Sequence, residues 1–221
     1  MQQQEKINVA IADDHVIFRD GLKASLKKIS IVGQVYQCKN GQEVVNLLEN
    51  NDVEVLLLDI EMPVMNGIET ARWIIKNKPK VNIIVLTMFN NRRYIMELYD
   101  IGVIGYLMKN TDVSELTKAI TMALQGDSYY CTEAQNVIFK DLLRKDKVTT
   151  SGETLKKISA REMEVLKLIC EQNATEEIAE KLFISPLTVK RHRQILMEKT
   201  NSKNLAGLVV FAIKNDIYKV Y

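Results

Sequence analysis

Four short apolar segments of this 221-residue chain each end at polar residues, and this feature constrains the fold more than any other. The segments span residues 7–12, 55–58, 81–86 and 104–108. The polar residues at their ends are, in the same order, Asp13 with Asp14, Asp59, Thr87 and Lys109. The run at 55–58 lacks polar alternation, which is typical of a strand buried on both faces of a parallel sheet. Because the carboxyl ends of parallel strands meet at one edge, we expect these polar side chains to cluster.

The first half of the chain alternates such strands with amphipathic helices. Another strand is expected at residues 31–36. Apolar residues recur at helical spacing within residues 17–29, 44–48, 68–75, 94–101 and 113–124. Five strand–helix units joined by right-handed crossovers predict an α/β doubly wound, five-stranded parallel sheet.

The expected cluster combines three carboxylates with one hydroxyl group and one ammonium group. Three neighbouring carboxylates repel one another unless a cation lies among them. Oxygen ligands with open positions for water suit Mg²⁺. An amine and a hydroxyl group beside this metal suit an incoming phosphoryl group. The pattern therefore predicts an aspartate that is phosphorylated with the help of Mg²⁺.

The second half of the chain predicts helices without strands. A helix is expected from Thr132 to Arg144, followed by a polar interdomain linker at residues 145–153. Four further helices are expected to begin at the capping residues Ser159, Thr175, Ser185 and Asn204. The middle two, Thr175–Leu182 and Pro186–Thr200, predict a helix-turn-helix joined by a short turn.

A local concentration of basic residues accompanies this helix pair. Residues 185–203 contain one acidic residue, Glu198, and five basic residues: Lys190, Arg191, Arg193, Lys199 and Lys203. A basic strip of this kind is what binding to a phosphate backbone requires. A solvated helix face is the alternative explanation.

Two sets of motifs resemble known families. Residues 6–125 resemble the receiver domain of two-component response regulators, in DIEMPVMNG at 59–67 and GYLMK at 105–109. Residues 156–217 resemble the LuxR-type helix-turn-helix, in SARE at 159–162 and TVKRHR at 188–193. Together they resemble a NarL/FixJ-type transcriptional regulator. The resemblance implies a flavodoxin-like receiver domain at 1–127, a helix and flexible linker at 128–155, and an all-α four-helix DNA-binding domain at 156–221.

The receiver resemblance implies a role for most of the polar residues. A partner histidine kinase would phosphorylate Asp59. Mg²⁺ would be held by Asp13, Asp14, Asp59 and the main-chain carbonyl group of Glu61. Lys109 would pair with the phosphoryl oxygens, since its ammonium group is a compact positive charge.

The same resemblance implies a conformational switch. Thr87 would bond to the phosphoryl group, and Tyr106 would then rotate inward from solvent. Simple packing of a half-buried aromatic residue is the alternative for Tyr106. Glu61, Met88 and Phe89 are expected to line the route of water to the acyl phosphate and to set its lifetime.

The LuxR resemblance implies that the second helix of the pair binds double-stranded DNA. The residues expected to read bases in the major groove are Lys190, Arg191 and Gln194. Those expected to contact phosphates are Thr188, His192, Arg193 and Lys199. His192 could instead be a packed histidine. The apolar final helix could form a homodimer contact in the active protein or pack into the core.

Composition and rival patterns narrow the class of protein. The three cysteines are an odd number without CxxC spacing, and no apolar run approaches a signal peptide or a membrane span. We therefore expect a cytoplasmic regulator that is not an enzyme beyond its own phosphotransfer and dephosphorylation. A haloacid dehalogenase-type phosphatase is the rival, but Asp59 lacks that family's second Asp and Thr. A second rival is a regulator that binds DNA without phosphorylation.

Overall fold

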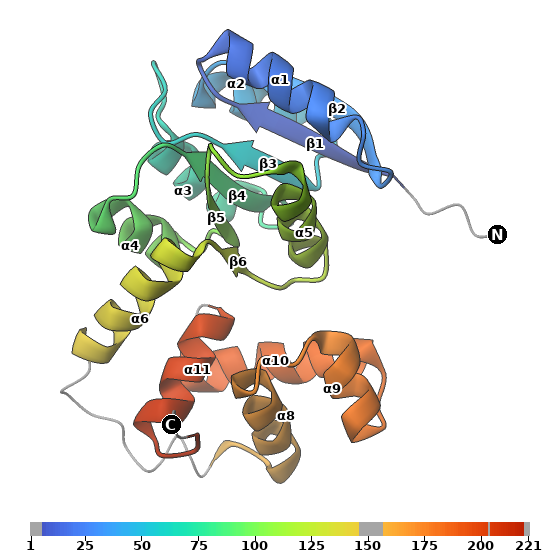
Figure 1. Cartoon of the computed structure of the whole chain (residues 1–221), viewed down its shortest axis with the longest axis vertical. Helices are drawn as coiled ribbons and strands as arrows, with labels where there is room; N and C mark the ends of the chain where they lie inside the picture. The colour runs from blue at the N-terminus through green and yellow to red at the C-terminus, as the bar shows by residue number, and fades with distance from the viewer. Residues whose placement is uncertain (1–5, 146–156, 203, 219–221) are drawn as a thin grey trace. The chain divides into compact units, whose positions relative to one another are not determined.

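The computed structural model describes residues 6–145, 157–202 and 204–218 (Figure 1). The chain divides into two compact units, Met1–Ala134 and Gln135–Tyr221, and the division lies within helix α6 (Thr132–Lys145). Most of the predicted linker at residues 145–153 lies outside the described residues. Among the helices of the described residues, none has both the length and the apolar composition that crossing a membrane requires.

The first unit is built on a parallel sheet of six strands in the order β2-β1-β3-β4-β5-β6. The strands are β1 (Ile7–Ala12), β2 (Val32–Cys38), β3 (Val55–Leu58), β4 (Asn82–Thr87), β5 (Gly105–Met108) and β6 (Tyr129–Tyr130). The predicted doubly wound parallel architecture is thereby confirmed. The apolar run of β3 is buried throughout, as its lack of polar alternation indicated.

Strand β6 corrects the predicted number of five strands. It has only two residues, which pair with Gly105 and Tyr106 of β5. Two residues are too few to show the periodicity of a strand, so the sequence pattern could not indicate it. The Tyr130 hydroxyl group donates a hydrogen bond to the Val103 carbonyl oxygen at 2.6 Å and fixes this short strand to the sheet edge.

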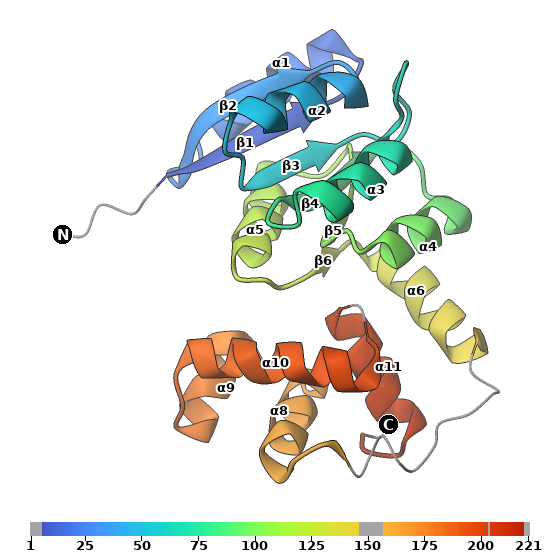
Figure 2. The same cartoon turned by 180° about the vertical axis from the view of Figure 1, so that it is seen from behind.

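Five helices cover the two faces of the sheet. They are α1 (Val16–Leu26), α2 (Gly41–Asn50), α3 (Gly67–Asn77), α4 (Arg92–Ile101) and α5 (Val113–Leu124). Helices α1 and α5 lie on one face, and α2, α3 and α4 lie on the other (Figures 1 and 2). Leu26 of α1 and Ile120 of α5 belong to one buried cluster with Val9 and Leu107 of the strands. These layers leave the carboxyl ends of the strands free of helices.

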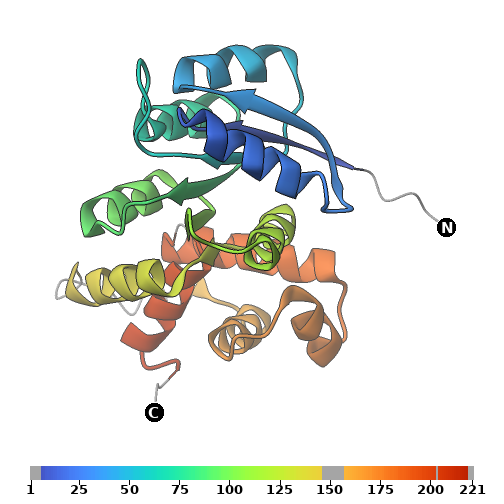
Figure 3. The ribbon, with the colours of Figure 1, turned by 45° about the horizontal axis from the view of Figure 1, so that its top comes forward.

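The second unit contains α8 (Ala160–Cys170), α9 (Thr175–Leu182), α10 (Pro186–Thr200) and α11 (Leu205–Lys214). The bounds of α9 and α10 confirm the predicted helix-turn-helix. Helix α10 packs against α8, α9 and α11 (Figure 3). Leu166, Ile178, Leu196 and Phe211 each bring one of the four helices into a common core.

Three of the four predicted helix caps are confirmed. A side-chain oxygen accepts a main-chain N–H at Ser159, Ser185 and Asn204. The prediction for α9 was wrong, because Ala174 occupies its N-cap and Thr175 is its first helical residue. Thr175 is fully buried, and its hydroxyl group is used in the core instead of at the helix end.

Candidate functional site

The predicted cluster of strand-end residues forms at the carboxyl edge of the sheet. Main-chain hydrogen bonds continue the strand pairing one residue beyond the strands. The Asp59 N–H donates to the Ala12 carbonyl oxygen at 2.9 Å, and the Lys109 N–H donates to the Thr87 carbonyl oxygen at 2.9 Å. These bonds bring Asp13, which follows Ala12, to the same edge as Asp59.

Lys109 joins two buried carboxylates. Its Nζ atom lies 2.6 Å from Oδ2 of Asp13 and 2.7 Å from Oδ2 of Asp59. Burial raises the pKa of Asp59 above its ordinary value, although the hydrogen bond and charge of Lys109 oppose this effect. Burial acts to lower the pKa of Lys109, but its bonds to Asp13 and Asp59 outweigh burial and the pKa is raised. Lys109 is therefore held as a cation beside the Asp59 carboxylate.

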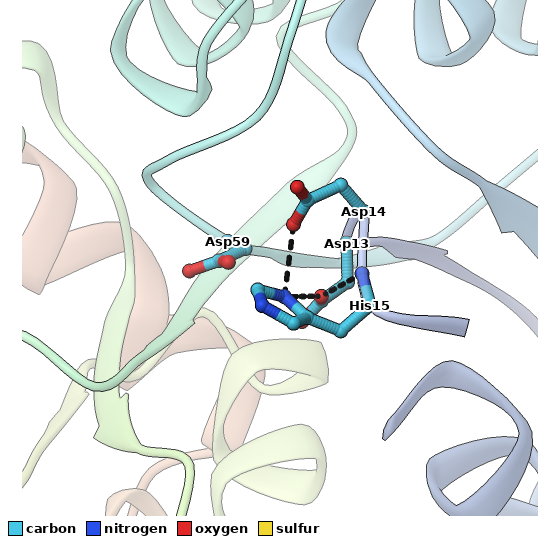
Figure 4. A group of neighbouring side chains, drawn as sticks. All are labelled: Asp13, Asp14, His15 and Asp59. Carbon is cyan, nitrogen blue, oxygen red and sulfur yellow. Dashed lines mark hydrogen bonds and ion pairs between the residues drawn. The ribbon is translucent and has the colours of Figure 1, made fainter. Parts of the chain in front are cut away.

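The acidic group offers oxygen donors that fit a divalent cation. Ligand atoms of Asp13, Asp14, His15 and Asp59 all lie within 4.8 Å of one another (Figure 4). Asp13 and Asp59 are buried, whereas the Asp14 side chain is 38% exposed. A cavity of about 460 Å³ lies next to the group, with Asp14, Glu61 and Tyr94 among its lining residues. Three carboxylates beside an open cavity match the oxygen-rich ligand set of Mg²⁺.

His15 belongs to this group but was not predicted from the sequence. Its only sequence signal is its position directly after Asp13 and Asp14. Its Nδ1 atom lies 3.1 Å from Oδ1 of Asp13 and 2.9 Å from Oδ1 of Asp14. The imidazole group therefore contacts both carboxylates at once (Figure 4).

Tyr106 and Thr87 both contact the main chain of Phe89. The Tyr106 hydroxyl group donates to the Phe89 carbonyl oxygen at 2.6 Å, and Thr87 Oγ1 accepts from the Phe89 N–H at 3.2 Å. Tyr106 is 1% exposed, so it is neither half-buried nor turned toward solvent. Burial raises the pKa of Tyr106 above its ordinary value, which keeps the hydroxyl group protonated as a donor. This inward position is the one expected to follow phosphorylation.

Of the three residues expected to control water access, Glu61 lines the cavity next to the acidic group. Met88 is 67% exposed directly after Thr87. Phe89 and Tyr94 meet edge to face, with ring centroids 5.9 Å apart. The Tyr94 hydroxyl group lies 3.4 Å from Oε1 of Glu61, so Tyr94 joins these residues although the sequence did not single it out.

Helix α10 exposes part of the predicted DNA-contacting set. Arg191 and Gln194 are exposed, and Lys190 is partly exposed. Thr188 is partly buried in the first turn, where its N–H donates to Ser185 Oγ at 3.1 Å. His192 is also partly buried, and its Nδ1 atom is buried without a hydrogen-bond partner among the residues that the structure describes. This burial favours the alternative of a packed histidine.

Arg193 does not lie where a phosphate contact requires it. The residue is 6% exposed, and its guanidinium group donates to the hydroxyl oxygen of Thr175 in α9. The α10 face that carries Val189, Leu196 and Arg193 points into the domain, because these positions are three or four residues apart. This burial and the bond to Thr175 do not support the predicted phosphate contact of Arg193, and they favour a structural role between the two helices.

Lys199 is also engaged inside the second unit. Its Nζ atom lies 2.8 Å and 2.7 Å from the two carboxylate oxygens of Glu162 in α8. Burial acts to raise the pKa of Glu162, but the bonds from Lys199 and from the Ser159 N–H lower it below its ordinary value. Lys199 thus neutralises a buried acid, which leaves less of its charge for a phosphate than predicted.

Comparisons with known proteins agree with both halves of this description. The response regulator receiver domain matches residues 9–121, and the luxR family of bacterial regulatory proteins matches residues 156–212. The chain is 33% identical to the uncharacterized transcriptional regulatory protein YxjL of Bacillus subtilis (strain 168), covering 97% of this chain and 98% of YxjL. It is 31% identical to the transcriptional regulatory protein DegU of Brevibacillus brevis, over 98% of this chain and 97% of DegU. A structure of the RcsB response regulator of Salmonella typhimurium superposes with a TM-score of 0.57 at 29% identity, covering 94% and 98%.

A receiver sheet with an acidic strand-end pocket, joined to a helix-turn-helix unit, defines a DNA-binding response regulator. The chain belongs to the NarL/FixJ-type family of two-component response regulators, which control transcription.

Proposed function

We propose that a partner histidine kinase transfers a phosphoryl group to Asp59 and that this transfer controls DNA binding by α10. The observation that supports the proposal most is that the Asp59 carboxylate belongs to the acidic group and also contacts Lys109. Oδ1 of Asp59 accepts the Ile60 N–H at 2.8 Å, and Oδ2 accepts from Lys109 at 2.7 Å. The carboxylate is thereby oriented as a nucleophile before a phosphodonor arrives.

The transfer breaks the P–N bond of a phosphohistidine and forms a P–O bond to Asp59. The leaving imidazole nitrogen keeps the electron pair of the broken bond and is protonated. Asp13, Asp14 and Asp59 would hold Mg²⁺, together with the Glu61 carbonyl group, and the bound ion supplies positive charge against the phosphoryl oxygens. Lys109, which pairs with Asp59 in this structure, would supply a second positive charge to the same oxygens.

The contacts of Phe89 support a route from the phosphoryl group to the surface. Thr87 would turn its hydroxyl group to the phosphoryl oxygens and release the Phe89 N–H. The carbonyl oxygen of Phe89 accepts the hydrogen bond from the Tyr106 hydroxyl group. Rearrangement of Phe89 after this release would change the support of the inward Tyr106, and a phosphoryl charge of about −1.5 to −2 is enough to bias such a two-state element.

The exposed face of α10 would enter the major groove of DNA. The bases would be read by Lys190, Arg191 and Gln194. The phosphates would be contacted by Thr188 and by the exposed portion of His192. The RcsB response regulator has been solved in a complex with DNA and as two dimers bound to two parallel DNAs. A protein that acts on DNA works in the cytoplasm of a bacterial cell, and there we locate this regulator.

We propose a homodimer as the active form, with masking of α10 by the receiver as the alternative switch. The sequence left open whether the apolar last helix forms a dimer contact or packs into the core, and Leu208, Phe211 and Ala212 of α11 are buried in the core of their own unit. Sedimentation of the phosphorylated full chain as a dimer would support dimerisation. Tighter DNA binding by residues 154–221 alone than by the unphosphorylated full chain would support masking.

The phosphorylation proposal is tested by intact-mass analysis. Incubation with a small phosphodonor and Mg²⁺ should add one phosphoryl mass to the protein, and Asp59→Asn should abolish the addition. Asp52→Asn is the matched control, because Asp52 is an exposed aspartate remote from the acidic group. Labelling of the Asp59→Asn variant, or labelling that does not need a divalent cation, would contradict the proposal.

A further inference from the structure

His15 is placed beside the acidic group by the start of α1. It occupies the N-cap position of this helix, but its side chain does not cap the helix. Its main-chain N–H donates to Oδ1 of Asp13 at 2.9 Å, which fixes the residue next to the buried carboxylate. The imidazole group is 69% exposed and nevertheless turns back toward the carboxylates (Figure 4). Hydrophobic burial therefore does not explain its position.

The two oxygens of Asp13 have separate partners. Oδ2 pairs with Lys109 at 2.6 Å, so it is occupied by an ammonium group. Oδ1 faces the Nδ1 atom of His15 at 3.1 Å. Oδ1 of Asp14 faces the same nitrogen at 2.9 Å. The His15 nitrogen thus lies close to one oxygen from each of two carboxylates, and neither oxygen is the one of Asp13 that bonds to Lys109.

These separations fit a shared cation as well as a shared proton. Neighbouring ligands of an octahedral ion lie about 3.0 Å apart when each metal–ligand bond is about 2.1 Å long. The two nitrogen–oxygen distances, 3.1 Å and 2.9 Å, are close to this value. A single N–H proton shared between two oxygens forms a weaker bifurcated bond to each, whereas a cation contacts both oxygens directly. The geometry therefore gives the imidazole nitrogen the place of a ligand.

We propose that His15 is a nitrogen ligand of the divalent-metal site and that it makes this site bind first-row transition metals more tightly than Mg²⁺. The inference rests on the proposed metal site at Asp13, Asp14 and Asp59. Imidazole nitrogen binds Mn²⁺, Fe²⁺, Co²⁺, Ni²⁺ or Zn²⁺ readily, whereas Mg²⁺ prefers oxygen and keeps its waters. A pocket with an added nitrogen donor discriminates between these two kinds of cation, which an all-oxygen pocket does to a smaller degree.

Direct metal binding tests the proposal without a measurement of phosphorylation. Calorimetric titration of the full chain, free of any histidine tag, would compare Co²⁺ with Mg²⁺. Replacing His15 with Ala should weaken Co²⁺ binding by about tenfold or more, the scale for groups that tune metal ligands. Mg²⁺ binding should change by less than about twofold, because an oxygen-preferring ion gains little from the nitrogen. The visible absorption of bound Co²⁺, which reports its ligand set, should change with the same substitution.

The sequence provides a matched control in its only other histidine, His192, which lies in α10. The His192→Gln variant should bind both metals at the acidic group as the wild type does. Equal weakening of Co²⁺ and Mg²⁺ by His15→Ala, or no weakening of either, would overturn the role of His15 and leave the metal site intact. Failure of the wild type to bind any divalent cation would instead overturn the metal site itself.

Discussion

Arg193 of α10 bonds through its guanidinium group to the hydroxyl oxygen of Thr175 in α9, and both side chains are buried. The bond joins the two helices of the helix-turn-helix from the inside. Their relative orientation decides how α10 presents Arg191 and Gln194 to DNA. Arg193 is therefore a positioning residue that acts through the helix pair.

Replacing Arg193 should affect stability, whereas replacing Arg191 should affect binding. Arg193→Ala leaves the buried Thr175 hydroxyl group without this donor, so the second unit should lose about 1–3 kcal/mol of stability. Hydrogen exchange of the α10 amides in the full chain measures this loss. Arg191 is exposed, and Arg191→Ala should leave exchange unchanged while it costs about 1–3 kcal/mol of binding at one operator position. A reduced salt dependence of DNA binding in Arg193→Ala, with normal exchange, would restore its predicted phosphate role.

The ion pair between Lys199 and Glu162 should couple α10 to α8. A double-mutant cycle with Lys199→Met and Glu162→Gln should give a coupling energy of at least about 1 kcal/mol, because Glu162 is buried. The matched control is Arg161 with Glu164, a more exposed pair on α8, whose coupling should be at most a few tenths of a kcal/mol. Hydrogen exchange measures both cycles. Equal coupling in the two pairs would show that burial adds nothing to the first.

The charge of Asp59 should make the first unit less stable at neutral pH. Burial raises the pKa of Asp59 in the folded protein. Such a group stabilises the fold below its unfolded pKa, and the stabilisation is lost as pH rises through the higher folded pKa. Asp59→Asn should therefore raise the free energy of unfolding at neutral pH, on the order of 1 kcal/mol. The gain should shrink as the pH falls toward the ordinary aspartate value of 3.8.

Fluorescence of Trp73 follows this effect in the full chain, since it is the only tryptophan and lies in α3 of the first unit. Denaturant unfolding with a chelator present, repeated over a range of pH, gives the difference between wild type and Asp59→Asn. A gain that stays constant with pH would contradict the assigned cause.

Gly67 should be essential for the position of Asp59. A Cβ atom at Gly67 would overlap the Asp59 carbonyl oxygen. The Gly67 N–H also donates to the Ile60 carbonyl oxygen at 2.8 Å. Gly67→Ala should therefore destabilise the first unit by about 1–3 kcal/mol and lower phosphorylation of Asp59. Gly21→Ala in α1 is the control, because a Cβ there meets no atom within 4 Å and should stabilise the helix by about 0.5–1 kcal/mol. Trp73 fluorescence reports both changes, and a neutral Gly67→Ala would contradict the close approach.

The sequence predicted the parts of the site that depend on strand ends. Asp13, Asp59, Thr87 and Lys109 could be placed together because parallel strands bring their carboxyl ends to one edge. It placed Arg191 and Gln194 on the exposed face of α10, but it did not predict that Arg193 points into the domain. Arg193 has the charge of a DNA contact, yet it lies on the buried side with Val189 and Leu196. Residue type and helical position gave opposite indications there, and packing decided between them.

Short-range geometry was likewise hidden from the sequence. The sequence pattern gave His15 no role, and only the distances of its Nδ1 atom connect its side chain to Asp13 and Asp14. Thr175 looked like a helix cap because threonine is common in that position. Its burial against Arg193 depends on a residue 18 positions away, a separation that local patterns do not cover.

The two residues of β6, which lie just before α6, pair with β5, the strand that contains Tyr106. Tyr130 pairs with Tyr106, and the Cys131 N–H donates to the Tyr106 carbonyl oxygen at 2.9 Å. Thr132, the first residue of α6, follows directly. Because β6 is hydrogen-bonded to β5, a shift of the β5 backbone would also move the start of α6. Through these two paired residues, the first turn of α6 is held to the sheet of the receiver domain.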